Sequence, residues 1–378
     1  MQRLRVHINA MMRMGAMADL GLRHAGAQRR GAAPSPAMMG RRAAYGAYQA
    51  ARVAWYAGHY ALAYRSLAAL GPPPWPVGPV PDRAVLMRDL AALFRRDLAN
   101  MEAGLYRAPL HSPWPWRELR RSRLFRRDLP AVDRRRQDRQ VVATADDPAL
   151  ADLPVYFRQA FHFQTGGYLT AESAELYDMQ VEVLFTGAAD AMRRQVLPDL
   201  RAALAGRPPR GLRLLDLACG TGRFTATLKD NWPGAQVTGL DLSQAYLEHA
   251  RRRVGPRPRM DWRQGAAEDL PWPDGHFDSV SAVFLFHELP RKVRARVAAE
   301  MVRVTRPGGA IVLVDSLQKG DRPDWDGLLD LFPHGFHEPY FRDYVQADLP
   351  ALFAPHGAIL QAEGTAFLSK HQVFRRRG

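Results

Sequence analysis

The chain of 378 residues is 47% hydrophobic and carries a formal net charge of +15, a composition typical of a folded globular protein with a basic surface. No uninterrupted apolar run reaches the roughly 18 residues that would span a bilayer, and residues 1–31 lack the apolar core of a secretory signal. The single cysteine, Cys219, excludes internal disulfides and cysteine-based metal clusters.

These observations predict a cytoplasmic protein, although the Arg-, Ala- and Met-rich residues 1–31 leave an organelle transit peptide or a misassigned start codon open. Almost all of the net charge lies in residues 1–150, which hold 25 arginines against 11 acidic residues. The densest run extends from Arg117 to Arg139. It could face the phosphates of a nucleic acid or an anionic membrane, but a solvated helix face is the more common role for such a run and is the interpretation we favour.

The spacing of apolar residues in the N-terminal half predicts helices. Residues 1–40 are expected to be weakly ordered, and residues 41–70 carry the apolar stripe of a helix that stops at Gly71. Asp82 is a candidate N-cap for a second helix, whose apolar residues recur at spacings of three or four up to Leu105. The two helices should form a hairpin. Residues 107–150 are expected to be an Arg- and Pro-rich linker, which gives an N-terminal region of residues 41–150 and a second domain of residues 151–378.

In the second domain, apolar runs of strand length alternate with helical segments, which predicts a parallel sheet. The expected strands are residues 213–218, 236–241, 259–263, 277–284 and 310–316. Helices are expected at 244–254 after Ser243, at 291–305 after Pro290 and at 341–353. Two closely spaced runs, 358–363 and 366–374, predict an antiparallel pair at the sheet edge. The predicted fold is a Rossmann-like three-layer α/β sandwich. Its sheet would be seven-stranded and mostly parallel, with an antiparallel edge strand.

One strand runs directly into a turn of small residues, Ala218-Cys-Gly-Thr-Gly222, and the next strand ends in Asp241. Adjacent parallel strands would bring this turn and this carboxylate to one side of a crevice, which is the geometry of a nucleotide site. A dinucleotide enzyme is the natural competitor. Arg223, Phe224 and Thr225 follow the turn, however, so the third small residue of the dinucleotide fingerprint is absent.

Five motifs occur in a characteristic order: Asp216-Leu-Ala-Cys-Gly-Thr-Gly222, Gly239-Leu-Asp-Leu-Ser243, Gly265-Ala-Ala-Glu-Asp-Leu-Pro271, Phe277-Asp-Ser-Val280 and Arg306-Pro-Gly-Gly-Ala310. With these motifs, residues 150–375 resemble class I S-adenosylmethionine-dependent methyltransferases. The resemblance is greatest to the small-molecule branch that includes the ubiquinone and menaquinone biosynthesis C-methyltransferases.

The resemblance implies S-adenosylmethionine as cofactor, with Asp216 facing its ammonium group and Asp241 its ribose hydroxyls. Gly220 and Gly222 would let the backbone approach its carboxylate. The implied cofactor-binding set is Asp216, Ala218, Cys219, Gly220, Gly222, Asp241, Leu242, Ala267, Glu268, Phe284, Tyr168 and Tyr177. The chain departs from the family at Ala266, where an acid usually contacts adenine. Glu268, Asp269 or the backbone at Ala267 is left to do so.

Residues 156–169 concentrate aromatic side chains beside a glycine pair and are interpreted as a lid over the cofactor, although packing of the helical hairpin onto the sheet would explain them too. His287, after the fourth strand, is the candidate catalytic base, with a structural role at a helix start as the alternative. The predicted acceptor pocket consists of Phe161, Phe163, Phe286, His337 and Tyr340. The spacing of the histidines and Glu338 in residues 334–340 is not that of a helical zinc motif, so no metal is predicted.

The sequence thus predicts an enzyme that methylates a small apolar or aromatic acceptor at oxygen or carbon. Two alternatives stay open, namely an RNA-directed methyltransferase that uses the basic N-terminal region and a cofactor-binding module without turnover. The Asn/Asp-Pro-Pro-aromatic motif of many amino-methylating nucleic-acid enzymes is absent where Phe286-His-Glu-Leu289 stands, which disfavours RNA. The identity of the acceptor and the oligomeric state are not predicted.

Overall fold

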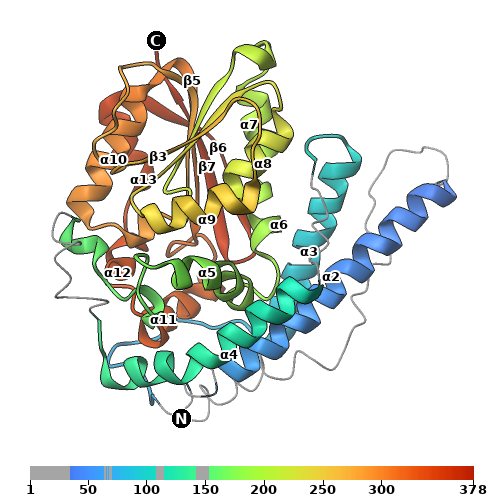
Figure 1. Ribbon diagram of the computed structural model, residues 1–378, viewed down its shortest axis with the longest axis vertical. Coiled ribbons are helices and arrows are strands. Elements are labelled where there is room, and N and C mark those ends of the chain that lie inside the picture. The colour runs from blue at the N-terminus through green and yellow to red at the C-terminus, as the bar shows by residue number, and fades with distance from the viewer. Residues whose placement is uncertain (1–34, 64, 66, 68–69, 108–114, 142–152) are drawn as a thin grey trace.

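The computed structural model describes residues 35–63, 65, 67, 70–107, 115–141 and 153–378 (Figure 1). Within these residues one sheet has seven strands in the order β3-β2-β1-β4-β5-β7-β6. The strands are β1 (Arg213–Leu217), β2 (Gln236–Asp241), β3 (Met260–Gln264), β4 (Phe277–Val283), β5 (Thr305–Ser316), β6 (Ala358–Ala366) and β7 (Ser369–Arg376). Strands β1 to β5 pair in parallel, and β7 pairs antiparallel with both β5 and β6. The predicted fold is therefore confirmed, with the reversed strand second from the edge.

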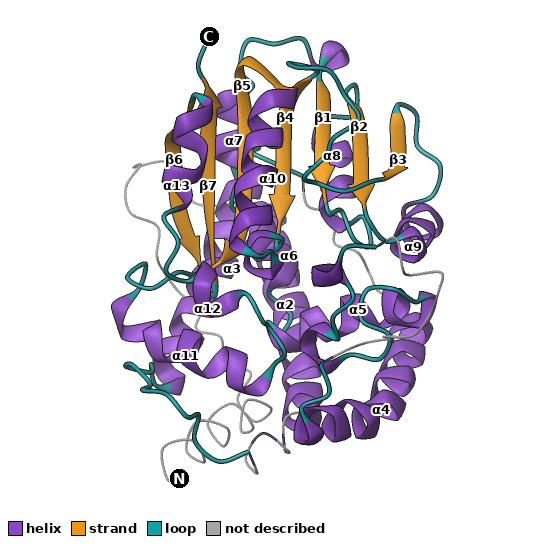
Figure 2. Ribbon diagram, turned by 90° about the vertical axis from the view of Figure 1, so that its left-hand side faces the viewer, coloured by secondary structure: helices purple, strands orange, loops and turns teal. Residues whose placement is uncertain are grey.

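Helices cover both faces of the sheet and make it the middle of three layers (Figures 1 and 2). Helices α10 (Arg291–Val304) and α13 (Leu349–Phe353) pack on one face, and α7 (Leu197–Ala203) and α8 (Arg223–Asn231) pack on the other. Helix α9 (Gln244–Val254) lies along β2 and β3 and begins as predicted, since Ser243 Oγ accepts from the backbone N–H of Tyr246. The apolar faces of the strands are consequently buried on both sides.

A second group of helices gathers at the end of the sheet to which the arrowheads of β1, β2 and β4 point (Figure 2). They are α2 (Pro36–Ala63), α3 (Arg83–Glu102), α4 (Pro115–Asp138), α5 (Ala171–Leu184), α6 (Ala189–Arg194), α11 (Asp326–Gly335) and α12 (Phe341–Tyr344). Asp82 caps α3 as predicted, accepting from the backbone N–H of Val85 at 2.8 Å. Helices α2 and α3 are in contact, as expected of the predicted hairpin, and Tyr45 Oη donates to Asp97 Oδ2 at 2.5 Å. These helices therefore cover the carboxyl ends of the parallel strands (Figure 2).

Helix α4 was not expected, because residues 107–150 read as a linker. Its buried positions, Ser122, Phe125, Val132 and Arg136, follow a helical period that numerous arginines obscure in the sequence. Arg136 is buried and donates to the carbonyl of Gly335 at 3.0 Å. Part of the arginine-rich run thus fastens α4 to α11. Residues 1–34, 108–114 and 142–152 of the predicted N-terminal segments lie outside the described residues.

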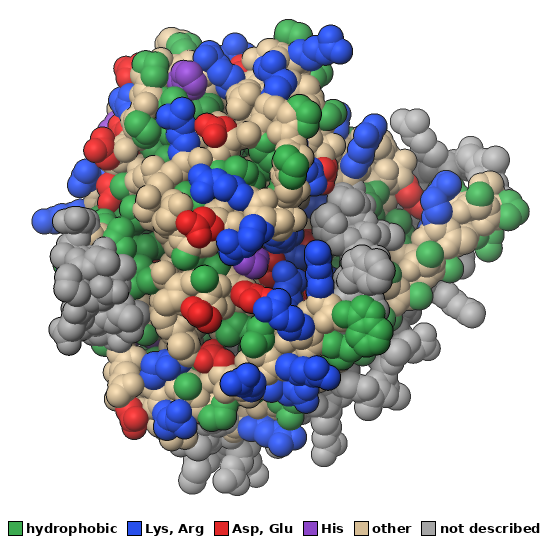
Figure 3. Space-filling view, in the orientation of Figure 1, with side chains coloured by type: hydrophobic (Ala, Val, Ile, Leu, Met, Phe, Trp, Pro, Cys, Tyr) green, Lys and Arg blue, Asp and Glu red, His purple; other side chains and the backbone are tan. Residues whose placement is uncertain are grey.

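The outer face of α4 is basic and solvated, with Arg123, Arg126, Arg127 and Arg134 exposed. On the face drawn in Figure 3, Lys and Arg side chains alternate with acidic and apolar ones. Among the described helices, none combines the length and the hydrophobicity that a bilayer crossing requires.

Candidate active site

The turn after β1 has the backbone shape that its glycines allow. Gly220 and Gly222 have φ of 53° and 74°, in the left-handed region. A Cβ at Gly222 would come within 2.5 Å of the Trp262 ring, whereas a Cβ at Gly220 would meet nothing within 4 Å. Gly222 is therefore required for packing, and Gly220 leaves its backbone open to the cleft beside it.

Ala218 is strained in the same turn, because its φ of 49° is one that side chains disfavour. We expect Ala218→Gly to raise the free energy of unfolding by about 1 kcal/mol, less the entropy that glycine adds to the unfolded chain. Ala295→Gly, in the second turn of helix α10, is the matched control and should lower that free energy by about 1 kcal/mol. Urea denaturation of both variants measures the two effects. A lower free energy of unfolding in Ala218→Gly would contradict the inference that Ala218 is strained.

Asp241 ends β2 beside this turn. Its Oδ2 accepts from the backbone N–H of Gly220 and its Oδ1 from that of Ser243, both at 2.8 Å. Each oxygen keeps a second lone pair for a ligand hydroxyl. Burial raises the pKa of Asp241 to about 6, against the opposing effect of the two N–H donors. The carboxylate thus holds the turn in place and still faces the cleft.

Asp216 lies deeper than expected. It is buried at the end of β1 and accepts from Thr225 Oγ1 at 2.6 Å and from Ser281 Oγ at 3.0 Å. Burial raises its pKa to about 7. It does not belong to the cleft wall that the described residues form, and neither do Cys219, Gly222 and Glu268. Direct contact of Asp216 with the cofactor stays a prediction, and the structure gives the residue a supporting position beneath the turn.

The cleft itself has a volume of about 80 Å³. Eight residues of the predicted cofactor set line it: Ala218, Gly220, Asp241, Leu242, Ala267, Phe284, Tyr168 and Tyr177. Glu268 instead accepts from Tyr156 Oη, at 2.8 and 3.0 Å from its two oxygens, and so holds one end of residues 156–169, which were predicted to form a lid. Of the groups left to contact adenine, namely Glu268, Asp269 and the backbone at Ala267, the structure thus places only Ala267 in the cleft wall that the described residues form.

Aromatic rings close one side of the cleft. Phe161 is stacked on Tyr168 with ring centroids 5.2 Å apart, and Tyr168 meets Tyr177 and Tyr246 edge-on. The segment is fastened to β2 and α9, since Ser243 Oγ donates to the carbonyl of Tyr168 at 2.6 Å. Aromatic faces attract a sulfonium cation. The open Gly220 backbone, the free lone pairs of Asp241 and this aromatic wall therefore fit S-adenosylmethionine.

A larger cavity of about 210 Å³ adjoins the cleft. Its wall is mostly apolar and includes Leu86 and Leu90 of α3 and Phe332 of α11. Three residues line both spaces: Tyr177, Phe284 and Glu288. The two cavities consequently meet at one junction, which lies at the carboxyl end of β4.

Acidic and imidazole side chains surround this junction. His287 Nδ1 lies 2.6 Å from Asp315 Oδ1, and His287 Nε2 lies 3.9 Å from Glu288 Oε1. Burial alone would lower the pKa of His287, but the neighbouring Asp315 outweighs it and the pKa rises to about 9. Burial raises the pKa of Glu288 to about 7. His287 therefore lines the larger cavity beside the junction, with a carboxylate that fixes its ring, and its role as a catalytic base stays a prediction.

The predicted acceptor residues are placed differently. Phe161 lines the cofactor cleft, and Phe286 is fully buried against Phe353. Phe163, His337 and Tyr340 do not belong to the wall of the larger cavity as the described residues form it. Residues after the fifth strand do line the larger cavity, among them Phe332, His334 and Phe336. Helix α3, which precedes the sheet in the chain, forms another part of its wall.

The sequence interpretation missed Glu288, Asp315 and the cavity wall of α3. Asp315 was detectable, because β5 neighbours β4 and its carboxyl end lies beside His287. Glu288 directly follows His287, the candidate catalytic base, in the sequence. The contribution of α3 had no comparable signal, since its apolar stripe is equally typical of core packing.

Comparisons with known proteins identify the family of the chain. The family model described as "Methyltransferase domain" matches residues 214–309. The chain is 36% identical over 202 residues to the ubiquinone/menaquinone biosynthesis C-methyltransferase UbiE of Desulfotalea psychrophila, a match that covers 53% of this chain and 77% of that protein. It is 35% identical over 198 residues to the demethylmenaquinone methyltransferase of Deinococcus radiodurans, covering 52% and 72%.

A fatty-acid O-methyltransferase of Mycolicibacterium smegmatis is 33% identical over 141 residues, covering 37% of this chain and half of that one. Among solved structures, the S-adenosylmethionine-dependent methyltransferase of Mesorhizobium loti is 22% identical, with 48% and 97% of the two chains covered and a TM-score of 0.35. The identity to relatives of which this chain covers more than two thirds establishes the family. The chain belongs to the class I methyltransferases, and S-adenosylmethionine is its cofactor.

Proposed function

We propose that the protein transfers the methyl group of S-adenosylmethionine to a small acceptor of apolar or aromatic character, at oxygen or carbon. The observation that carries this proposal is the meeting of an apolar cavity with the cofactor cleft at Tyr177, Phe284 and Glu288. An acceptor in the larger cavity would present its reacting atom at that junction and leave its apolar part among Leu86, Leu90 and Phe332.

The bound cofactor supplies a methyl group on a positively charged sulfur, which an acceptor lone pair or activated ring carbon displaces with release of S-adenosylhomocysteine and a proton. The chain aligns the two reactants and excludes water, which are the main requirements of an in-line displacement. His287 would take the acceptor proton in its neutral form, which a pKa of about 9 makes the minor form at neutral pH, while Asp315 fixes its ring from the Nδ1 side.

Radiolabelled methyl transfer into fractionated extracts tests this function. We expect label in small apolar or phenolic metabolites and stoichiometric S-adenosylhomocysteine. Label confined to RNA would favour the RNA-directed alternative, and cofactor binding without label in any fraction would favour a non-catalytic module. The relatives named for quinone and fatty-acid methylation make lipid-like acceptors the first fractions to examine. The cytoplasmic location expected from the sequence stays a prediction.

For the acceptor so identified, we expect His287→Gln to lower kcat by about 100-fold, the lower end of what a positioned acid–base group contributes. Affinity for S-adenosylhomocysteine should be unchanged, since His287 does not line the cofactor cleft formed by the described residues. His356→Gln, at an exposed position, is the matched control. Steady-state kinetics and calorimetry separate the two effects. Full turnover in His287→Gln would leave the residue a structural role only.

A further inference from the structure

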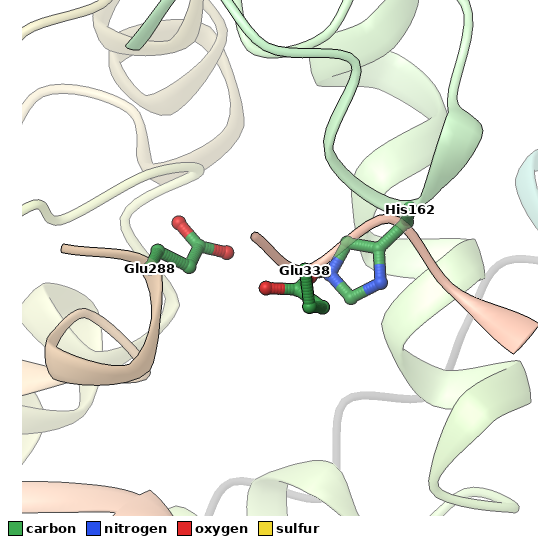
Figure 4. Close-up of side chains that lie close together, drawn as sticks. All are labelled: His162, Glu288 and Glu338. Carbon is green, nitrogen blue, oxygen red and sulfur yellow. Dashed lines mark ion pairs between the residues drawn. The ribbon is translucent and has the colours of Figure 1, made fainter. Parts of the chain in front are cut away.

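Three side chains from distant parts of the chain meet beside the junction of the two cavities, where Glu288 lines both cavities and His162 lines the larger one. His162 belongs to the aromatic lid, Glu288 follows β4, and Glu338 follows helix α11. Their nearest ligand atoms all lie within 4.8 Å of one another. Figure 4 shows the carboxyl groups of Glu288 and Glu338 on either side of one space, with the His162 ring beside Glu338.

Glu338 is the unusual member of this cluster. Its side chain is fully buried, and neither of its oxygens accepts a hydrogen bond from any described residue. Its ionic contact is His162 Nε2, 3.0 Å from Oε1. A buried carboxylate without hydrogen-bond donors is strongly destabilising unless a positive charge compensates it. One imidazole supplies at most a single charge, while Glu288 brings a second carboxylate to the same space.

We propose that His162, Glu288 and Glu338 bind a first-row divalent cation such as Zn²⁺ or Mn²⁺. Imidazole nitrogen and carboxylate oxygen form a ligand set that suits these ions. Bonds of about 2.0–2.2 Å to one ion put its ligands roughly 3–4 Å apart, so the observed cluster needs only small side-chain rotations. The sequence spacing gave no hint of this site because its three ligands come from three segments.

The surroundings hold these ligands in place. Tyr168 Oη donates to Glu288 Oε1, and the backbone N–H of His162 donates to the carbonyl of His337 at 3.1 Å. The His162 ring meets Phe332 and Phe336 edge-on. Such outer partners orient metal ligands and exclude competing water.

The position of the cation specifies the acceptor class, an inference that rests on the proposed function. Glu288 lines both cavities, so the ion would lie where the acceptor meets the methyl group. A divalent cation binds oxygen and lowers the pKa of a bound hydroxyl. The acceptor is then an oxygen nucleophile such as a phenol or enol. Its proton passes to solvent by way of His287, which lines the larger cavity, its lone pair bonds to the methyl carbon, and the C–S bond electrons go to sulfur.

The test measures metal binding apart from catalysis. The full chain, purified without chelator, should contain one Zn²⁺ or Mn²⁺ ion per molecule by elemental mass spectrometry. After dialysis against EDTA, calorimetric titration with each chloride salt should restore one ion. Because outer-shell partners alone are worth about 10–100-fold in metal affinity, we expect Glu338→Gln and Glu288→Gln each to weaken binding at least tenfold. Glu248→Gln, at an exposed position on α9, should bind as the unaltered protein does.

Titration with S-adenosylhomocysteine monitors folding and the cofactor cleft in every sample. A variant that binds neither the metal ion nor S-adenosylhomocysteine is misfolded, and the His162→Gln variant is then used in its place. Failure to bind either ion in protein that binds S-adenosylhomocysteine would overturn the metal site and leave the methyltransferase function intact. If the His162, Glu288 and Glu338 variants all bound metal as tightly as the unaltered protein, the ion would lie elsewhere and the proposal would be overturned too. Methyl transfer that falls on chelation and returns with either ion would support the oxygen acceptor.

Discussion

Replacing Asp241 by asparagine is expected to weaken the binding of S-adenosylhomocysteine about 1,000-fold, because hydrogen bonds to a charged acceptor are worth roughly 1.5–3 kcal/mol each and two ribose hydroxyls are at stake. The amide also cannot accept from both Gly220 and Ser243, whose N–H groups now share the two carboxylate oxygens. Calorimetry measures the loss. Asp261→Asn, in the adjacent strand β3 and half exposed, is the matched control and should bind normally. Unchanged affinity in Asp241→Asn would remove the ribose assignment.

The same carboxylate should make cofactor affinity depend on pH. The pKa of Asp241 is about 6 in the protein without ligand, so below pH 6 the group is protonated and loses its capacity to accept from both hydroxyls. Affinity should therefore fall by up to tenfold per pH unit as the pH drops below about 6. Asp216, with a pKa of about 7, acts in the same direction, since its ionised form favours a cationic ligand. The Asp241→Asn profile should be flatter than that of the unaltered protein, and identical profiles would contradict the assignment.

The free energy of unfolding of the protein without cofactor should change with pH in the opposite direction, rising as the pH drops. A buried carboxyl whose pKa is raised in the folded state stabilises the fold below its ordinary pKa, and that stability is lost as the pH rises through the folded value. For Asp241, a rise from the ordinary 3.8 to about 6 corresponds to a loss of about 3 kcal/mol between pH 4 and pH 6. The site is thus electrostatically strained in the absence of its cationic ligand.

The sheet and its cofactor edge were predictable from local patterns. Strand β2 has the predicted bounds, Ser243 and Asp82 cap the expected helices, and Asp241 lies beside Gly220 because adjacent parallel strands end at the same edge. These features depend on residues close in sequence or on a strand order that the fold class prescribes. They required no knowledge of side-chain packing.

The junction was not predictable in the same way. Glu338 and His162 are brought together by the packing of α11 against the lid, and no spacing in the sequence encodes that contact. Helix α4 was missed for a related reason, since its buried face includes Arg136 and Ser122, polar residues that a hydrophobic pattern does not register. Tertiary contacts of polar side chains are the common element of these failures.

One buried ion pair contributes to the attachment of helix α3 to the methyltransferase domain. Asp97 of α3 has no exposed side-chain surface, and Arg194 of α6 donates to its two oxygens at 2.9 and 2.6 Å. Tyr45 and Tyr106 donate to the same carboxylate. Helix α3 supplies Leu86 and Leu90 to the wall of the larger cavity. The pair therefore fixes the element that closes the proposed acceptor site.

We expect Arg194→Met to lower the free energy of unfolding by about 3–5 kcal/mol, because it leaves Asp97 buried without its cation. Arg42→Met is the matched control. Arg42 also donates to two oxygens of an α3 acid, Glu102, but its side chain is 44% exposed, so the loss should stay below about 1 kcal/mol. Urea denaturation compares the two variants.

The double variant Arg194→Met/Asp97→Leu distinguishes the pair from general packing. Replacing both charges by apolar groups removes the uncompensated carboxylate, so it should recover part of the stability lost in the single variant. Recovery will be incomplete because Tyr45 and Tyr106 lose their acceptor. Equal losses in Arg194→Met and Arg42→Met, or no recovery in the double variant, would show that burial of this pair does not hold α3 in place.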